Sequence, residues 1–387
     1  MKIFFIQFGL LVSSFIAIAQ VRLSPNIILP KDSSKTQMLI TSLNGFLSQK
    51  DSANESNTYV LKDNLLETSI LLDEFKHIEV SDEHKDNKFY KPYLNNIVVI
   101  DSQSFLIQLS YIGQKDNASD LAAVFEMIAI EKDNKYFFNS PLKKNTKFWK
   151  VKRLPKTTFY FKDKLNANKA KEFNDKIEDF DTKLNLKNIK TEWYGCEDIH
   201  EVFSLFGVKY HANYNGRKHV SGFTTTQNNT HLILSGENNE EFNQFDLHDL
   251  WHSRSGMVIP KAKYHKATDC AYAHIVGGSW GISWETIWKM FKERVASDKN
   301  KNWLEEYGKW QNFGDSADKH LRTEYILNAL LTEMIEKKYG MDKVIEFMSI
   351  GPYSKTNENY FSALERITGI TKATYNQELW KLINQKL

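Results

Sequence analysis

The spacing of apolar residues changes along this chain, and that change most constrains the fold. In the first region Phe105, Ile107, Leu109 and Tyr111 alternate with polar residues, which indicates a half-buried strand. Further on, apolar residues recur at every third or fourth position, as over 170–184, which indicates an amphipathic helix. Strands that come first and helices that come later predict an α+β fold.

The first region is expected to form a small domain on an antiparallel sheet over residues 20–152. Residues 20–90 are polar and predict few elements. The sequence AVFEMIAIEKDNKYFFNSP predicts two strands around a turn at Asp133-Asn134. A basic stretch with two prolines follows at 141–156, and we interpret it as a solvated connector to a second domain at 157–387.

The second domain is expected to begin with strands, including 157–161 and 230–236, and to continue with helices. A helix that carries two histidines follows the strand at 230–236 and is expected to end at Gly256, because glycine often ends helices. Helical spacing then predicts a C-terminal bundle that ends near residue 385.

The chain begins with a stretch typical of a secretory signal peptide over residues 1–19. Lys2 precedes an apolar run, and Ala17-Ile-Ala19 has the small residues of a cleavage site. Polar residues interrupt the run, and it is short for a membrane anchor. We therefore expect cleavage after Ala19 and a secreted or periplasmic protein without a membrane segment.

Charge and cysteine content narrow the classes of partner. The 51 basic and 48 acidic residues nearly balance, so nothing in the charge favours nucleic acid as a partner. The chain has two cysteines, Cys196 and Cys270. In an oxidising compartment they could form a disulfide, and Cys270 is also a candidate metal ligand.

The sequence HDLWH at 248–252 is the most specific chemical signal in the chain. Residues four apart lie on one face of a helix, so His248 and His252 are expected to point the same way. Two neutral imidazoles at this spacing can bind one zinc ion, and the acid after the first can act on a water molecule. The alternative is a pair of histidines that lines a polar helix face.

The second domain resembles the gluzincin type of metallopeptidase, in particular the peptidase MA-like families. The resemblance covers roughly 157–385 and lies in the strand THLILSG, the helix HDLWH, the segment DCAYAHIVGGSWG and the C-terminal helices. It implies a zincin-like domain with a mixed sheet, an active-site helix and a closing helical bundle. It also implies that the strand at 230–236 is a sheet edge that aligns a peptide substrate.

Two positions depart from the family pattern. Asp249 stands where the family has a glutamate base, and its carboxylate is shorter by about 1.5 Å, one carbon–carbon bond. Cys270 stands where the resemblance, aligned on Gly277-Gly278, implies a glutamate as third zinc ligand. A cysteine thiolate also binds zinc. Asp269 and His274 are rival third ligands, and the remaining alternative is a site without a third ligand in which Cys270 is a small buried residue.

The resemblance also implies a downstream tyrosine or histidine that stabilises the oxyanion, and Tyr325 is the candidate, with a core tyrosine as the alternative. We therefore expect an exported zinc metallopeptidase-like hydrolase that acts on a peptide or protein substrate, with catalysis by Asp249 and zinc held by His248, His252 and Cys270. The alternative is a non-catalytic binding protein, a pseudoenzyme on a degenerate peptidase scaffold.

Overall fold

A computed structural model describes residues 20–216, 222–236, 246–316 and 319–386. The fold is α+β, as expected. Its contacts divide the chain into two compact units, of which unit 1 comprises Met1–Lys150 and Trp193–Glu237 and unit 2 comprises Val151–Glu192 and Asn238–Leu387. Residues 193–237 therefore group with the N-terminal region, whereas the sequence-based division placed them in the second domain, 157–387.

Two expectations concern the chain terminus and the membrane. The expected signal peptide, residues 1–19, lies outside the described residues. Within the part of the chain that the structure describes, no helix is both long and apolar enough to cross a lipid bilayer.

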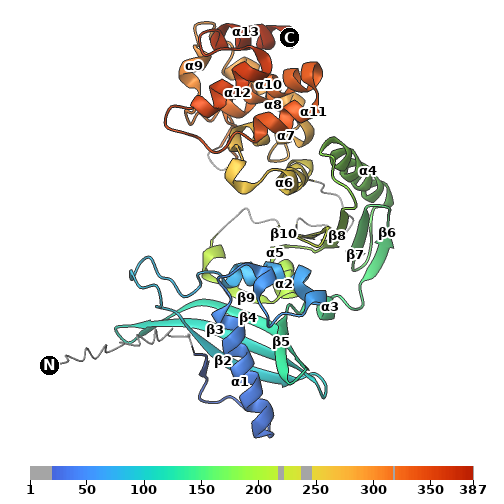
Figure 1. The fold of residues 1–387 in the computed structure, drawn as a ribbon, viewed down its shortest axis with the longest axis vertical. Coiled ribbons are helices and arrows are strands. Elements are labelled where there is room, and N and C mark those ends of the chain that lie inside the picture. Colours follow the sequence, from blue (N-terminus) through green and yellow to red (C-terminus); the bar gives the residue numbers. More distant parts are fainter. Residues whose placement is uncertain (1–19, 217–221, 237–245, 317–318, 387) are drawn as a thin grey trace, which may run out of the picture. The chain divides into compact units, whose positions relative to one another are not determined.

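Unit 1 contains a six-stranded sheet (Figure 1). Its strands are β1 (Arg22–Leu23), β2 (Lys91–Val99), β3 (Ser104–Lys115), β4 (Ala118–Lys132), β5 (Lys135–Asn139) and β9 (Val208–His211). They follow the order β1-β2-β3-β4-β5, and β9 pairs with β4. Only the β1–β2 pair is parallel. The alternating residues of β3 are buried, and Asp133 and Asn134 both have positive φ in the β4–β5 hairpin, as tight hairpin turns require.

Helices cover this sheet, although the sequence of residues 20–90 predicted few elements. The helices of unit 1 are α1 (Ser33–Ser48), α2 (Leu65–Phe75), α3 (Leu142–Asn145) and α5 (Ile199–Phe206), with short 3₁₀ turns η1 (Asn54–Ser56), η2 (Lys62–Asn64) and η3 (Ala212–Tyr214). α1 packs against β5 (Figure 1). It buries Leu39, Leu43, Phe46 and Leu47, a helical spacing that is visible in the sequence.

The strand expected at a sheet edge has a neighbour on each side. β10 (Gly222–Gln227) pairs antiparallel with β11 (Thr230–Ser235) along its whole length, and β8 (Lys190–Gly195) follows β11 in the sheet order. The expectation that 230–236 forms the free edge of the sheet was therefore wrong, because the backbone groups on that side of β11 pair with β10.

Unit 2 is mostly helical. Its elements are β6 (Lys150–Arg153), β7 (Thr157–Phe161), α4 (Ala167–Lys183), α6 (Leu247–Val258), η4 (Lys261–Lys263), α7 (Lys266–Gly277), α8 (Trp284–Arg294), α9 (Trp303–Glu306), α10 (Thr323–Tyr339), α11 (Met341–Met348), α12 (Glu358–Thr368) and α13 (Tyr375–Gln385). α10 is buried over most of its length and contacts α7, α8, α11 and α13. It therefore forms the centre of the C-terminal bundle.

Trp251 and Arg254 of α6 anchor this helix to α4. Trp251 packs edge-on against Phe180 with ring centroids 5.4 Å apart. Arg254 is fully buried and forms an ion pair with Asp181 at 3.1 Å. Because a buried cation needs a partner, the pair restricts the rotation of α6. Trp251 also packs against Tyr272 of α7, with ring centroids 4.2 Å apart.

Candidate metal centre

The helix that carries the two histidines begins at a capped N-terminus. The Asp246 side chain accepts a hydrogen bond from the backbone N–H of Asp249 at 3.0 Å, which satisfies one of the free donors of the first turn. The helix was expected to end at Gly256 but continues to Val258. That expectation was wrong because Gly256 has helical backbone angles here and serves no terminating role.

Two glycines at the end of α7 bring it close to α6. A Cβ at Gly277 would lie 2.3 Å from the backbone nitrogen of His248, so only glycine fits. Gly278 has a φ of 68°, a conformation that glycine adopts without strain. As a result the Gly278 carbonyl lies 2.6 Å from Nδ1 of His248 and accepts its hydrogen.

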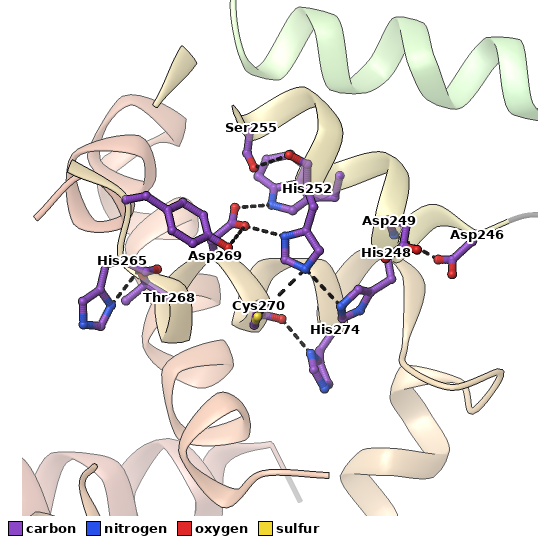
Figure 2. Close-up of polar contacts among 12 residues, drawn as sticks. Asp246, His248, Asp249, His252, Ser255, His265, Thr268, Asp269, Cys270 and His274 are labelled. Carbon is purple, nitrogen blue, oxygen red and sulfur yellow. Dashed lines mark hydrogen bonds and ion pairs between the residues drawn. The ribbon is translucent and has the colours of Figure 1, made fainter. Parts of the chain in front are cut away.

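His248 and His252 converge at their Nε2 atoms, which lie 3.1 Å apart. Figure 2 shows both rings projecting from α6 toward Cys270 and His274 of α7. The Nδ1 atom of each ring donates to an oxygen, that of Gly278 for His248 and that of Asp269 for His252. Because these acceptors fix the hydrogens on Nδ1, the lone pairs on the neutral rings are left on the two Nε2 atoms.

Asp269 accepts three hydrogen bonds at the base of this pair. Its carboxylate is fully buried and lies 2.5 Å from Nδ1 of His252, and Trp251 Nε1 and Tyr264 Oη each donate to it at 3.0 Å. Both oxygens are engaged by these donors. In this structure Asp269, a rival third ligand from the sequence, therefore orients His252, as carboxylates behind metal-binding histidines commonly do.

Burial and neighbouring charges give the two histidine rings different pKa values. Burial and the neighbouring His252 lower the pKa of His248. Burial also opposes the charged form of His252, but its hydrogen bonds to Asp269 and Cys270 outweigh this effect and raise the pKa of His252 to about 10. At neutral pH His252 therefore carries a second proton, which it shares with Nε2 of His248 in a hydrogen bond, and a metal ion would have to displace that proton.

Cys270 is the third donor that the structure places beside the pair. Its Sγ lies 3.9 Å from Nε2 of His252, and its side chain is buried. His274 directs its Nδ1 to the Cys270 carbonyl at 2.6 Å, whereas its Nε2 is buried with no hydrogen-bond partner among the described residues. The His274 ring lies 5.0 Å from that of His248, centroid to centroid.

The donor set fits zinc in its chemistry and falls slightly short in its geometry. Zinc bonds of about 2.0 Å to nitrogen and 2.3 Å to sulfur, at a tetrahedral angle, place two nitrogens roughly 3.3 Å apart and a nitrogen and a sulfur roughly 3.6 Å apart. The two Nε2 atoms are close to this spacing, and Sγ lies a few tenths of an ångström too far. Among the described residues, no group of three His, Cys, Asp or Glu side chains is arranged so that it could hold a metal ion.

The two expected catalytic residues lie at different depths. Asp249 is exposed in the first turn of α6, beside Asp246 (Figure 2). Tyr325 is buried in α10, packs with Ala267 and Cys270, and lies edge-on to His274 with ring centroids 5.6 Å apart. Burial and the negative charge of Cys270 raise the pKa of Tyr325 to about 12, so its hydroxyl remains a hydrogen-bond donor at neutral pH.

Sequence reasoning missed the groups that orient the histidines. The Gly278 carbonyl and Tyr264 carried no recognisable signal, since their contacts depend on how α7 packs on α6. The paired glycines at 277–278 were a usable signal for close helix approach. Among the described residues no disulfide is formed, and Cys196 belongs to unit 1 whereas Cys270 belongs to unit 2.

Comparison with known proteins adds no family to this geometry. No protein-family model matches the chain, no curated protein matches its sequence, and no solved structure matches its fold.

Proposed function

We propose that this chain is an exported, gluzincin-like metallohydrolase that binds one zinc ion through His248, His252 and Cys270 and cleaves peptide bonds. The observation that carries the proposal is the 3.1 Å separation of two Nε2 atoms whose rings are each fixed at Nδ1 by an oxygen acceptor. Such outer hydrogen bonds are the usual support of metal-binding histidines. The resemblance in sequence to peptidase MA-like families supports a zincin-like fold for the second domain.

Each residue of the site has a distinct role in this proposal. When bound, zinc supplies a Lewis acid that polarises a carbonyl and lowers the pKa of water. Asp249 takes the proton of the attacking water, a role that requires hydrogen-bond reach to it. The Tyr325 hydroxyl donates to the carbonyl oxygen as negative charge develops there.

A second candidate is a non-catalytic exported binding protein on a degenerate peptidase scaffold, a pseudoenzyme that holds a structural metal or none. The observation that favours it is the place of Asp249, which is exposed in the capped first turn of α6 and has a shorter side chain than glutamate. The two candidates differ in whether Asp249 acts on water.

The zinc content of the purified protein tests whether His248 and His252 form a metal site. We expect one zinc per chain in the wild type and a loss of most of it in His248→Ala and His252→Ala. The matched control is His77→Ala, because the His77 side chain is 78% exposed in unit 1. A wild-type protein that holds no zinc after dialysis against micromolar zinc would refute the metallohydrolase and leave the non-catalytic candidate.

A cleavage assay on the zinc-loaded protein separates the candidates. Under the first candidate, the wild type cleaves a mixed peptide library and Asp249→Ala does not, although both hold zinc. If zinc is bound and neither protein cleaves any peptide, the non-catalytic candidate is the correct one.

A further inference from the structure

Arg322 is fixed on all sides immediately before α10. It donates from Nη1 to the Tyr325 hydroxyl and from Nη2 to Glu324, both at 3.0 Å. Its guanidinium also lies over the rings of Trp310 and Tyr325, 4.6 and 4.7 Å from their centroids. Arg322 is only 8% exposed, so this arrangement is a built feature of the fold and not a surface contact.

The hydrogen bond between Arg322 and Tyr325 has only one possible direction. A guanidinium has donors and no acceptor, so the Tyr325 oxygen must accept from it. The Tyr325 hydrogen cannot point at Arg322, and the Cys270 side chain is its hydrogen-bond partner. The residue that packs against Tyr325 on the side of the metal centre is Cys270.

Glu324 anchors the far side of the guanidinium. Its Oε2 accepts from Arg322 Nη2 and, at 2.9 Å, from the Tyr353 hydroxyl. Glu324 is 1% exposed, and burial raises its pKa, an effect that Tyr353 and Arg322 oppose. Because Glu324 holds one end of the fork, the other end stays directed at the Tyr325 oxygen.

We propose that Arg322 is a positioning residue that directs the O–H of Tyr325 toward Cys270, where the carbonyl oxygen of a bound substrate would replace the sulfur as its acceptor. The inference rests on the proposed metallohydrolase function and adds to it the residue that sets the direction of hydrogen donation. Arg322 does not itself touch the substrate, and it acts only through Tyr325. A double-mutant cycle follows directly from this, since an effect transmitted by Tyr325 must disappear when its hydroxyl is removed.

The test uses the zinc-loaded full chain and a dipeptide phosphonate, whose anionic oxygens resemble a carbonyl oxygen that gains charge. Affinity is measured by titration calorimetry for the wild type, Tyr325→Phe, Arg322→Gln and the double variant. We expect Tyr325→Phe to weaken binding by about tenfold or more and Arg322→Gln by about threefold to tenfold. We expect Arg322→Gln to have no further effect in the Tyr325→Phe background, and Arg322→Lys, which keeps a donor, to recover part of the loss.

Two results would overturn the inference. One is a loss of phosphonate affinity from Arg322→Gln that is as large in the Tyr325→Phe background as in the wild type. A general structural effect of the substitution would give that result. The other is unchanged phosphonate affinity in either single variant that still holds one zinc.

A second measurement does not need the metal. In metal-free protein with ¹³Cζ-labelled tyrosine, the resonance of Tyr325, assigned by its absence in Tyr325→Phe, should move in Arg322→Gln and return toward its original position in Arg322→Lys. A resonance that does not move refutes the contact itself. If instead the proposed metallohydrolase function is wrong, the wild-type protein binds no zinc, and this result is independent of the tyrosine resonance.

Discussion

The Asp269 carboxylate accepts the Nδ1 hydrogen of His252 across 2.5 Å, from one helix to the next. Asp269 is fully buried on α7, and its two oxygens also accept hydrogen bonds from Trp251 and Tyr264. The carboxylate therefore cannot rotate toward a metal ion without breaking these bonds. Its position determines both the tautomer and the orientation of His252, and so the direction of the Nε2 lone pair.

Replacement of Asp269 by asparagine should weaken zinc binding by about 10- to 100-fold, the usual effect of losing an outer partner of a histidine ligand. An amide binds the Nδ1 hydrogen less strongly than a carboxylate does. Competition with a chromophoric chelator measures the affinity. Asp342→Asn, at an exposed position in the first turn of α11, is the control and should bind zinc as the wild type does. Equal affinity in both variants would show that Asp269 does not support the site.

Asp249 can be tested by lengthening as well as by removal. If its carboxylate acts on water from too far away, Asp249→Glu should raise the cleavage rate, because the extra methylene restores reach. Asp249→Ala should abolish cleavage, and all three proteins should hold one zinc. Rates are compared on one peptide found in the library assay. Equal rates in the three proteins would exclude Asp249 as the base.

The close approach of α6 and α7 can be tested with two glycines. Gly277→Ala places a methyl group against the backbone of His248 and should destabilise the protein by about 1–3 kcal/mol. It should also weaken zinc binding, because it displaces the Gly278 carbonyl. Gly256→Ala meets no atom within 4 Å in the interior of α6 and should stabilise the protein by about 0.5–1 kcal/mol. Urea unfolding measures both, and a destabilised Gly256→Ala or a neutral Gly277→Ala would contradict the packing.

Glu74 should make the stability of unit 1 depend on pH. Burial raises the pKa of this α2 residue to about 7, against the opposing hydrogen bond from Tyr214. The folded chain therefore binds the proton more tightly than the unfolded chain, whose carboxyl has its ordinary pKa of 4.5. The contribution of Glu74 to stability is complete below pH 4.5 and is lost as the pH rises to 7, by at most about 3 kcal/mol.

Glu74→Gln removes this titration and keeps an acceptor for Tyr214. Relative to the wild type, the variant should gain stability at pH 8 and gain little or none at pH 4, as measured by urea unfolding at the two pH values. A difference between the two proteins that is the same at both pH values would show that Glu74 does not titrate between them.

Local patterns predicted the parts of the site that depend on one element. The spacing of His248 and His252 places them on one face of a helix whatever surrounds that helix, and the structure has their Nε2 atoms 3.1 Å apart. In the same way, Asp133-Asn134 predicted the turn of a hairpin, since asparagine and aspartate tolerate positive φ. The helix over Ser33–Ser48 was equally visible in its apolar spacing and was overlooked because its surroundings are polar.

The sequence by itself therefore determined which side chains share a helix face or a turn, because those relationships depend only on the geometry of a few consecutive residues. The tertiary structure alone decided that Asp269 orients His252, that the Cys270 sulfur lies 3.9 Å from Nε2 of His252, and that Gly278 holds His248. It also decided that β10 pairs with the side of β11 that was expected to be a free edge. These contacts join elements that are separate in the chain. They follow from how helices and strands pack, which no local spacing specifies.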